Sequence, residues 1–239
     1  GVAVFVMRTL RLTFGVHDHP WPPGAVVVTF TVVSFVADDF TRYLVHLLLH
    51  RVPALWELHK VHHSARVLTP FTLQRVHPLE GLLMAARLTV TLGLVTGVFV
   101  WLFPGKVRGY EVLGVDAIGF AFAAFGANLR HSHVWLSYGP VLERIAISPA
   151  QHQVHHSVDP AHHDRNFGAA LAVWDWLFGT LYVTRGHERL TFGLSPAESN
   201  HQENLGSVLL SPLLASLRAL VPVKIHRRIA PGLKSGAPT

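Results

Sequence analysis

The sequence predicts an all-α protein, an integral membrane helical bundle with about three to four transmembrane helices and a cytosolic His-rich helical cap. Two observations predict the bundle. Half of the 239 residues are hydrophobic while only 14% are charged, and the apolar residues gather into runs long enough to cross a bilayer. A third observation predicts the cap, because the 18 histidines include three short clusters at or beyond the ends of these runs, and imidazole is the commonest metal-binding side chain.

The first element, residues 1–24, is expected to be a truncated N-terminal hydrophobic segment followed by a Pro-rich loop. The chain opens on the apolar stretch Gly1 to Val6 without an initiator Met, which indicates missing upstream sequence. A signal peptide is not indicated, because no basic start precedes the apolar residues and no small-residue cleavage site is evident.

Three apolar runs are predicted to be membrane spans. The first covers residues 25–37 and continues to His50, and the second covers residues 79–103 and ends at a Pro-Gly turn. The third runs from about 110 to 129. The second and third runs read as two helices joined by a short turn, so the chain returns to the side it left and all the histidine clusters face one compartment.

Basic residues place that compartment in the cytosol, because cytosolic segments are enriched in Lys and Arg. The segments near the clusters carry Arg51, Lys60, Arg66, Arg75, Arg130, Arg144 and Arg165. The tight turn has only Lys106 and Arg108. We expect an integral protein of a bacterial inner membrane or an ER-type membrane. The net charge of +6 fits anionic headgroups, and no motif indicates nucleic acid.

The three clusters share a spacing that puts imidazoles on one helical face. They are His46-x-x-x-His50, His59-x-x-His62-His63 and His152-x-x-His155-His156. A lone histidine is usually a surface or hydrogen-bonded core residue, but eight at these spacings predict metal ligands. His131 follows the third run at the depth of the first cluster and is expected as a ninth ligand. The chain has no cysteine, which excludes Cys-rich zinc modules and iron–sulfur clusters.

The remaining histidines are assigned other roles. We expect surface positions for His17, His19, His187, His201 and His226, and structural roles for His77, His162 and His163. His133 stays open. The aromatic residues Trp174, Trp176, Phe178 and Tyr182 are expected in an interfacial belt.

Four polar residues near the clusters have two readings each. Asp39 lies seven residues before His46, so its carboxylate either accepts a proton from a ligand's second ring nitrogen or hydrates a helix end. Asp164, Asn166 and Asp175 either orient ligand imidazoles or shape a loop and cap a helix. No catalytic residue beyond the metal ligands is predicted.

These residues resemble the fatty acid hydroxylase and sterol desaturase superfamily of integral membrane di-iron proteins. The likeness rests on the three clusters in their order, on Asp164-Arg165-Asn166-Phe167-Gly168, on the segment Trp174 to Thr180, on His77-Pro78-Leu79-Glu80 and on Asn128-x-x-His131. It covers roughly residues 25–185. One departure is the three leucines inside the first cluster, where members often carry a basic residue. That puts in doubt any charge contact made from within this cluster.

The resemblance implies a dimetal site with two iron ions (Fe2+/Fe3+) bound mainly by imidazole, with O2 as co-substrate. It also implies an electron donor such as cytochrome b5 or a ferredoxin with its reductase, and a lipid substrate from the bilayer, sterol, fatty acyl or related, that is hydroxylated or desaturated. Residues 25–185 would be the catalytic membrane domain, and residues 186–239 a C-terminal peripheral segment and tail.

Two other function classes stay open, both of them zinc-binding membrane proteins without oxygenase activity. A metal transporter would place polar ligands within the spans, whereas the clusters here lie at the membrane edge. A structural scaffold that binds zinc is not distinguished from an iron enzyme by the sequence, because iron and zinc share ligands.

Overall fold

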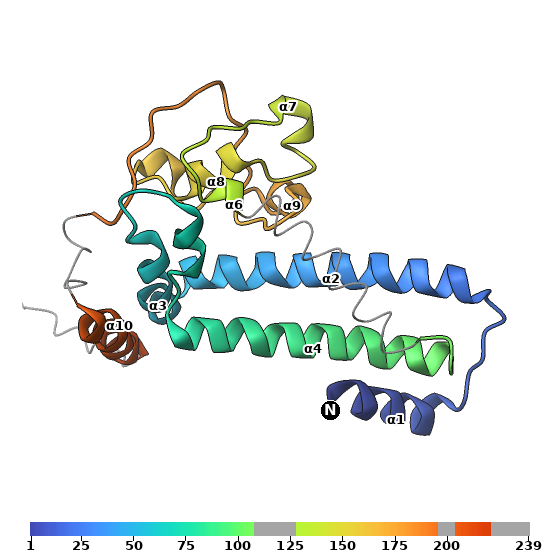
Figure 1. Ribbon diagram of the computed structural model, residues 1–239. Helices are drawn as coiled ribbons and strands as arrows, with labels where there is room; N and C mark the ends of the chain where they lie inside the picture. Colours follow the sequence, from blue (N-terminus) through green and yellow to red (C-terminus); the bar gives the residue numbers. More distant parts are fainter. Residues whose placement is uncertain (108–127, 196–203, 221–239) are drawn as a thin grey trace, which may run out of the picture.

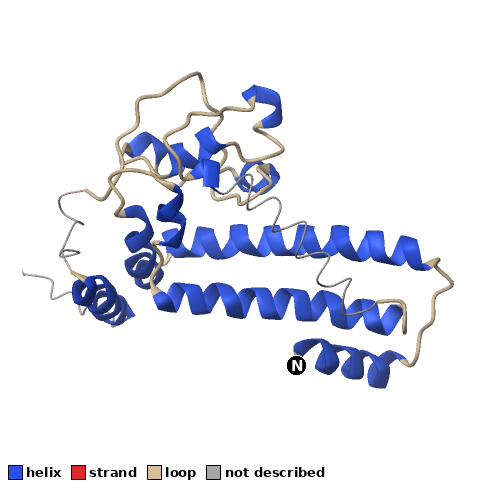
Figure 2. Cartoon of the chain, viewed as in Figure 1, coloured by secondary structure: helices blue, strands red, loops and turns tan. Residues whose placement is uncertain are grey.

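Helices make up the regular structure of the chain in the computed structural model, which describes residues 1–107, 128–195 and 204–220 (Figures 1 and 2). Within these ranges the only β pairing is two isolated bridges, Ala146 with Leu171 and Ser157 with Phe192. The all-α prediction is therefore confirmed for the described residues. The predicted third apolar run, His201, His226 and the tail from residue 230 lie outside them, apart from residues 128 and 129 of the run.

Two long helices lie side by side and form the elongated half of the molecule (Figure 1). They are α2 (Pro23–Arg51) and α4 (Pro78–Leu102), and both begin with proline, which fits the first turn of a helix. Their 29 and 25 residues correspond to about 43 Å and about 37 Å at the rise of an α-helix. Each contains one of the predicted apolar runs.

The surfaces of α2 and α4 suit a lipid environment. Val26 and Phe30 of α2 pack against Phe99 of α4 and against Phe103, but many other apolar side chains of the two helices are exposed, among them Val28, Leu82 and Val90. Only 22% of the most apolar stretch of α2 and 17% of that of α4 is buried. A core helix of a soluble protein would be mostly buried, so these two helices are candidate membrane spans by length, composition and exposure.

Helix α1 (Val2–Phe14) packs against α4 through two glycines one helical turn apart. A Cβ atom at Gly93 would lie 2.6 Å from the Cβ of Val2, and one at Gly97 would lie 2.6 Å from the Cβ of Val6. The absence of side chains therefore permits the close helix contact that small residues support in membranes.

Short helices form a cap beside the end of α2 that carries the histidines (Figure 1). They are α3 (Pro53–His63), η1 (Pro70–Gln74), α6 (Asn128–Arg130), α7 (Gly139–Leu142), α8 (Pro149–His155), η3 (Pro160–His162) and α9 (Val173–Phe178). Helix α3 begins at Pro53 and α8 at Pro149, and proline fits the first turn of a helix. A capping box between Ser148 and Gln151 fixes the start of α8.

Two polar contacts hold the cap and its neighbours in place. The buried carboxylate of Glu143 accepts hydrogen bonds from the hydroxyls of Ser137 and Ser148 and from Thr184, a network that the sequence analysis did not identify. His77 has the expected structural role, because its Nδ1 accepts from the Leu79 N–H at the start of α4. Its Nε2 donates to a carbonyl of α10 (Leu205–Leu220), which packs on α3.

Candidate metal centre

The structure gathers nine buried or half-buried histidines into two adjoining groups, and within each group the candidate ligand atoms lie within 4.8 Å of one another. The five-histidine group consists of His46, His50, His59, His63 and His155. The four-histidine group consists of His62, His131, His152 and His156. These nine are the residues that the sequence analysis expected to bind metal.

Helix geometry explains how the clusters divide between the groups. Residues four apart share a face, so His59 and His63 of α3 enter the five-histidine group together. His62 is rotated by about 100° from His63 and points into the other group. In the third cluster the pair four residues apart, His152 and His156, belongs to the four-histidine group, whereas His155 belongs to the five-histidine group. The groups meet where the rings of His63 and His156 stack, with centroids 4.4 Å apart.

Three rings of the five-histidine group are held by hydrogen bonds from Nδ1 to acceptors outside it. The pairs are His46 with the Phe167 carbonyl at 2.8 Å, His59 with Glu80 Oε1 at 2.9 Å and His155 with the Arg165 carbonyl at 2.8 Å. A carbonyl or carboxylate oxygen only accepts, so Nδ1 carries the proton and the lone pair remains on Nε2. This tautomer is the one that presents Nε2 to a metal ion.

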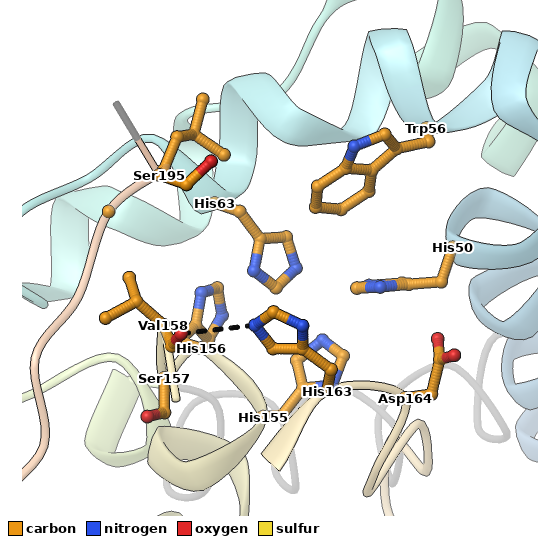
Figure 3. A pocket seen from close by; sticks show the side chains of 12 residues that line it. His50, Trp56, His63, His155, His156, Ser157, Val158, His163, Asp164 and Ser195 are labelled. Atoms are coloured by element: carbon orange, nitrogen blue, oxygen red, sulfur yellow. Dashed lines mark hydrogen bonds between the residues drawn. The ribbon is translucent and has the colours of Figure 1, made fainter. Parts of the chain in front are cut away.

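The Nε2 atoms of the five-histidine group point into a shared interior. Those of His50, His59, His63 and His155 are buried without a hydrogen-bond partner, and Figure 3 shows the rings of His50, His63 and His155 facing one another. Leaving several buried lone pairs unpaired is unfavourable. A bound cation would satisfy them together, so this donor set fits a metal ion.

In the four-histidine group the Nε2 atoms approach one another directly. His131 lies 3.2 Å from His62 and 3.0 Å from His152, and His152 lies 3.2 Å from His156, measured between Nε2 atoms. Metal–imidazole bonds of about 2.1 Å separate adjacent ligand atoms at right angles by about 3.0 Å. The observed spacing therefore also fits a metal ion.

The electrostatic environment keeps these imidazoles neutral. Burial, and then the neighbouring histidines, hold the pKa well below its ordinary value for His62, His63, His152, His155 and His156. Neutral imidazole is the form that binds metal, so no proton has to be displaced near neutral pH.

The loop of residues 164–171 supplies two of the outer acceptors and needs an unusual backbone. Asp164 and Asn166 have φ values of 59° and 56°, in the left-handed region that Asn and Asp tolerate best. The amide of Asn166 donates to the Gln151 carbonyl and accepts from the Tyr182 N–H. Asp164 forms an ion pair with Arg51 at 3.3 Å.

Two buried carboxylates clamp the same loop. Asp175 accepts from the N–H groups of Phe167 and Gly168, and burial raises its pKa to about 6. Asp39 accepts from the N–H groups of Ala170 and Leu171 and from the indole of Trp174 at 2.9 Å. The hydrogen bonds that these two carboxylates accept from backbone N–H groups thus go to the loop that carries the imidazole acceptors, and the carboxylates position ligands indirectly.

The carboxylate of Glu80 hydrogen-bonds to a clustered imidazole from outside, at His59, and this role was not predicted from the sequence. It was part of the His-Pro-Leu-Glu run that carried the resemblance, which was the available signal. Its side chain is almost fully buried, and its Oε2 has no hydrogen-bond partner. The carboxylate therefore faces the site with one oxygen on His59 and the other unpaired.

The other singled-out residues lie outside both groups. His133 is exposed, His162 pairs with Glu188 at 3.4 Å and His187 packs edge-on against Trp135. Of the four aromatic residues expected in an interfacial belt, two are well exposed, Trp176 and Phe178.

Two cavities reach the histidines from different sides. A cavity of about 480 Å³ lies between α2, α4 and the 164–171 loop, and its wall includes Phe35, Arg42 and Met84 together with histidines of both groups. A second cavity, of about 230 Å³, approaches from the cap, and its wall includes Trp56 and Asp164 (Figure 3).

Several known proteins are similar to this chain in sequence. A family model described as fatty acid hydroxylase matches residues 31–180. Ornithine lipid hydroxylase OlsE of Rhizobium tropici is 31% identical over 70% of this chain and 46% of its own length. The Delta(7)-sterol 5(6)-desaturase of Eremothecium gossypii is 31% identical over 77% of this chain and 46% of its own length. Human alkylglycerol monooxygenase is 26% identical over 80% of this chain and 37% of its own length. No solved structure matches the chain.

The matched part of the chain spans less than half the length of these curated relatives. By their names, they are oxidoreductases that act on lipids: a hydroxylase, a monooxygenase and a desaturase. The family match contains all nine clustered histidines and covers well over half of the sequence. The chain belongs to the fatty acid hydroxylase family, within the superfamily that also includes the sterol desaturases.

Proposed function

We propose that the chain is the catalytic part of a membrane-bound, di-iron, O2-dependent oxidoreductase that hydroxylates or desaturates a lipid. The observation that carries the proposal is the pair of adjoining groups of buried, neutral imidazoles at one end of two apolar, outward-facing helices. The names of the relatives support the same class of reaction.

The nine histidines are proposed to hold two iron ions, one in each group. When bound, iron supplies the activation of O2 and the one-electron chemistry that an unactivated C–H bond requires and that amino-acid side chains lack. The protein's own part is to fix the rings, through the Phe167 and Arg165 carbonyls and the Glu80 carboxylate. These contacts orient the rings of His46, His59 and His155, so that their Nε2 atoms can bind metal without a change of ring orientation.

The larger cavity is the proposed substrate site. It touches histidines of both groups, and Phe35 of α2 and Met84 of α4 contribute apolar wall. Such a wall suits a lipid that arrives from the bilayer, and it excludes water from the place where the C–H bond is broken.

The proposed hydroxylation requires two electrons from outside the chain. In balanced form, R–H, O2, two electrons and two protons give R–OH and water, while desaturation removes two hydrogens from the lipid and yields two molecules of water. We propose that a one-electron carrier such as cytochrome b5 or a ferredoxin, with its reductase, supplies the electrons.

We propose three to four membrane spans, with the histidines on the cytosolic side, a catalytic membrane domain at 25–185 and a peripheral segment at 186–239. The position of α6 beside α8 supports a third span, because α4 leads away from the histidines (Figure 1). The absence of native cysteine makes the test direct. A membrane-impermeant thiol reagent should label Arg66→Cys from the cytosolic side and Lys106→Cys from the opposite side, and labelling of both from one side would refute this topology.

Metal analysis tests the function itself. After anaerobic reconstitution the protein should hold two iron ions per chain and consume O2 when a reductant and membrane lipid are present. Lipids from cells with the gene should gain one oxygen atom for hydroxylation or lose two hydrogens for desaturation, as measured by mass spectrometry. Stoichiometric zinc, with no O2 consumption by iron-loaded protein, would instead support a zinc-binding scaffold.

A further inference from the structure

A charged cluster joins α2 and α4 at the point where their apolar surfaces end. Arg87 of α4 donates to Asp38 of α2 at 2.7 Å, and Arg42 donates to the same carboxylate at 3.0 Å. The uninterrupted apolar part of the first run, residues 25–37, ends just before Asp38, and α4 becomes continuously apolar only after Arg87. In the proposed membrane orientation, the cluster therefore marks the boundary between hydrocarbon and headgroups on both helices.

The metal centre lies on the water side of this boundary. Asp38, Arg42 and His46 follow one another at intervals of four residues along α2, so they occupy nearly one face. Each interval corresponds to about 6 Å of helix rise. All three side chains line the larger cavity, which thus extends from the boundary level up to the histidines.

The charges along the cavity wall are unequally available. Asp39 is occupied by two backbone N–H groups and an indole, and Glu80 by His59. Arg130, which also lines the cavity, is buried and donates to the Ala169 carbonyl. Asp38 is shared between two arginines. The side chain of Arg42 is 45% exposed and bonds to Asp38 through Nε. Because guanidinium carries five N–H donors in a fixed fork, Arg42 can offer further donors to the cavity.

We propose that Arg42 binds an anionic group, a carboxylate or a phosphate, on the lipid substrate, and that the oxidised carbon lies in the head region close to that group. This inference rests on the proposed function and specifies its substrate as an anionic amphiphile. Guanidinium recognises both kinds of anion through paired hydrogen bonds. With the anion one helical turn from His46 and the tail toward the bilayer, the part that reaches the metal centre is the polar end.

Photo-crosslinking tests the orientation on the iron-loaded protein in lipid nanodiscs. One fatty acid probe carries a diazirine beside the carboxylate, and a second carries it at the methyl end. The first probe should label peptides around His46 and residues 167–170, and the second should label the apolar part of α2 before Asp38. The reverse pattern would overturn the proposed orientation.

Competition against the first probe tests the charge. Dodecanoate or dodecyl phosphate should compete at least tenfold better than dodecanol, and comparison of the two anions identifies which group is preferred. Arg42→Gln should remove most of this advantage, a loss of about tenfold or more, since a hydrogen bond to a charged group is lost. Arg42→Lys should retain part of it. Arg51→Gln is the matched control, because Arg51 is also half-exposed on α2 but pairs with Asp164.

The outcomes separate this inference from the proposed function. If the variants keep two iron ions per chain and O2 consumption while dodecanol competes as well as dodecanoate, the anion site is refuted and the oxidase proposal stands. If dodecyltrimethylammonium competes best, the cavity binds a cationic headgroup through Asp38, and the inference also fails. If the unmodified chain holds no iron, the proposed function fails first.

Discussion

The two histidine groups differ in what holds their rings in place. In the five-histidine group, His46, His59 and His155 each donate from Nδ1 to an acceptor outside the group. In the four-histidine group, the contacts between ring nitrogens run from one member to the next at 3.0 to 3.2 Å. The surrounding protein thus holds three rings of the five-histidine group through outer acceptors. In the four-histidine group the Arg75 backbone contacts His62, and the ring nitrogens lie close to one another.

This difference predicts unequal dependence on the metal. Rings fixed by carbonyls and a carboxylate keep their direction when no ion is bound, and the carboxylate also makes its imidazole a stronger donor. Neighbouring lone pairs repel unless a proton or a cation lies between them. The five-histidine group should therefore be the tighter and more preorganised site.

The largest expected effect comes from removing a ligand from either group. His155→Ala in the five-histidine group and His62→Ala in the four-histidine group should each lower turnover by more than about 100-fold, because even loss of an outer partner costs up to that amount. Each variant should retain close to one iron ion per chain, measured by metal analysis. His187→Ala is the control and should change neither quantity, since the ring packs against Trp135 outside both groups.

Equal metal loss in both ligand variants, down to none, would mean that the two groups form one cooperative site. Retained turnover in both would remove these residues from the metal centre altogether. Either result would refute the division of the metal centre into two separate metal-binding groups.

The nine histidines expected from the sequence to bind metal are the ones that the structure brings together, because this proximity depends largely on local geometry. Spacings of three and four residues bring imidazoles onto neighbouring helical faces wherever the helix lies. The apolar run that continues to His50 correctly indicated a helix, and the second and third clusters lie on α3 and α8, each of which begins at a proline. His131 was inferred from its depth after the third run, and it lies 3.0 Å from His152.

The supporting contacts were not predictable in the same way, because they connect distant parts of the chain. Asp39 lies only seven residues before His46, but its hydrogen-bond partners are Ala170, Leu171 and Trp174, more than 130 residues away. The Phe167 carbonyl depends on a left-handed backbone at Asn166. No periodic pattern encodes a backbone acceptor, so the division into groups of five and four also required the fold.

Changing Glu80 tests the supported group alone. Glu80→Gln keeps an acceptor for His59 but removes the charge, and Glu80→Ala removes both. The affinity of the five-histidine group for metal should fall by about 10-fold to 100-fold in the Ala variant, and by less in the Gln variant. Metal competition titrations would measure both affinities. Glu57→Gln is a control on α3, because Glu57 pairs with Lys60. Weakening of the four-histidine group instead would contradict the assignment of support.

Metal removal tests the order of affinity without any substitution. A chromophoric chelator should withdraw iron in two phases, with the four-histidine group emptied first and the rates differing by about tenfold, the lower end of the effect of outer partners. The ligand variants identify the phases, because each should lose one of them. A single phase, or release from the five-histidine group first, would show that the outer hydrogen bonds do not decide affinity.

The smallest expected effect comes from loosening the clamp that Asp39 places on the 164–171 loop. The Asp39 carboxylate accepts three hydrogen bonds from N–H groups, and in Asp39→Asn the amide N–H of the new side chain would face one of these donors. The loss of that hydrogen bond should lower the free energy of unfolding by about 1 to 3 kcal/mol. The Phe167 carbonyl would hold His46 less firmly, so the five-histidine group should lose a few-fold in metal affinity while the four-histidine group keeps its own. Trp174→Phe removes only the indole donor and should have a smaller effect in the same direction.

Asp18→Asn, at the far end of the helices, should leave both affinities unchanged, since Asp18 pairs only with Lys106 among the described residues. Equal weakening of the two groups by Asp39→Asn would mean that the loop supports the whole cap rather than one ring, and the contrast between the groups would then rest on Glu80 and the Arg165 carbonyl alone.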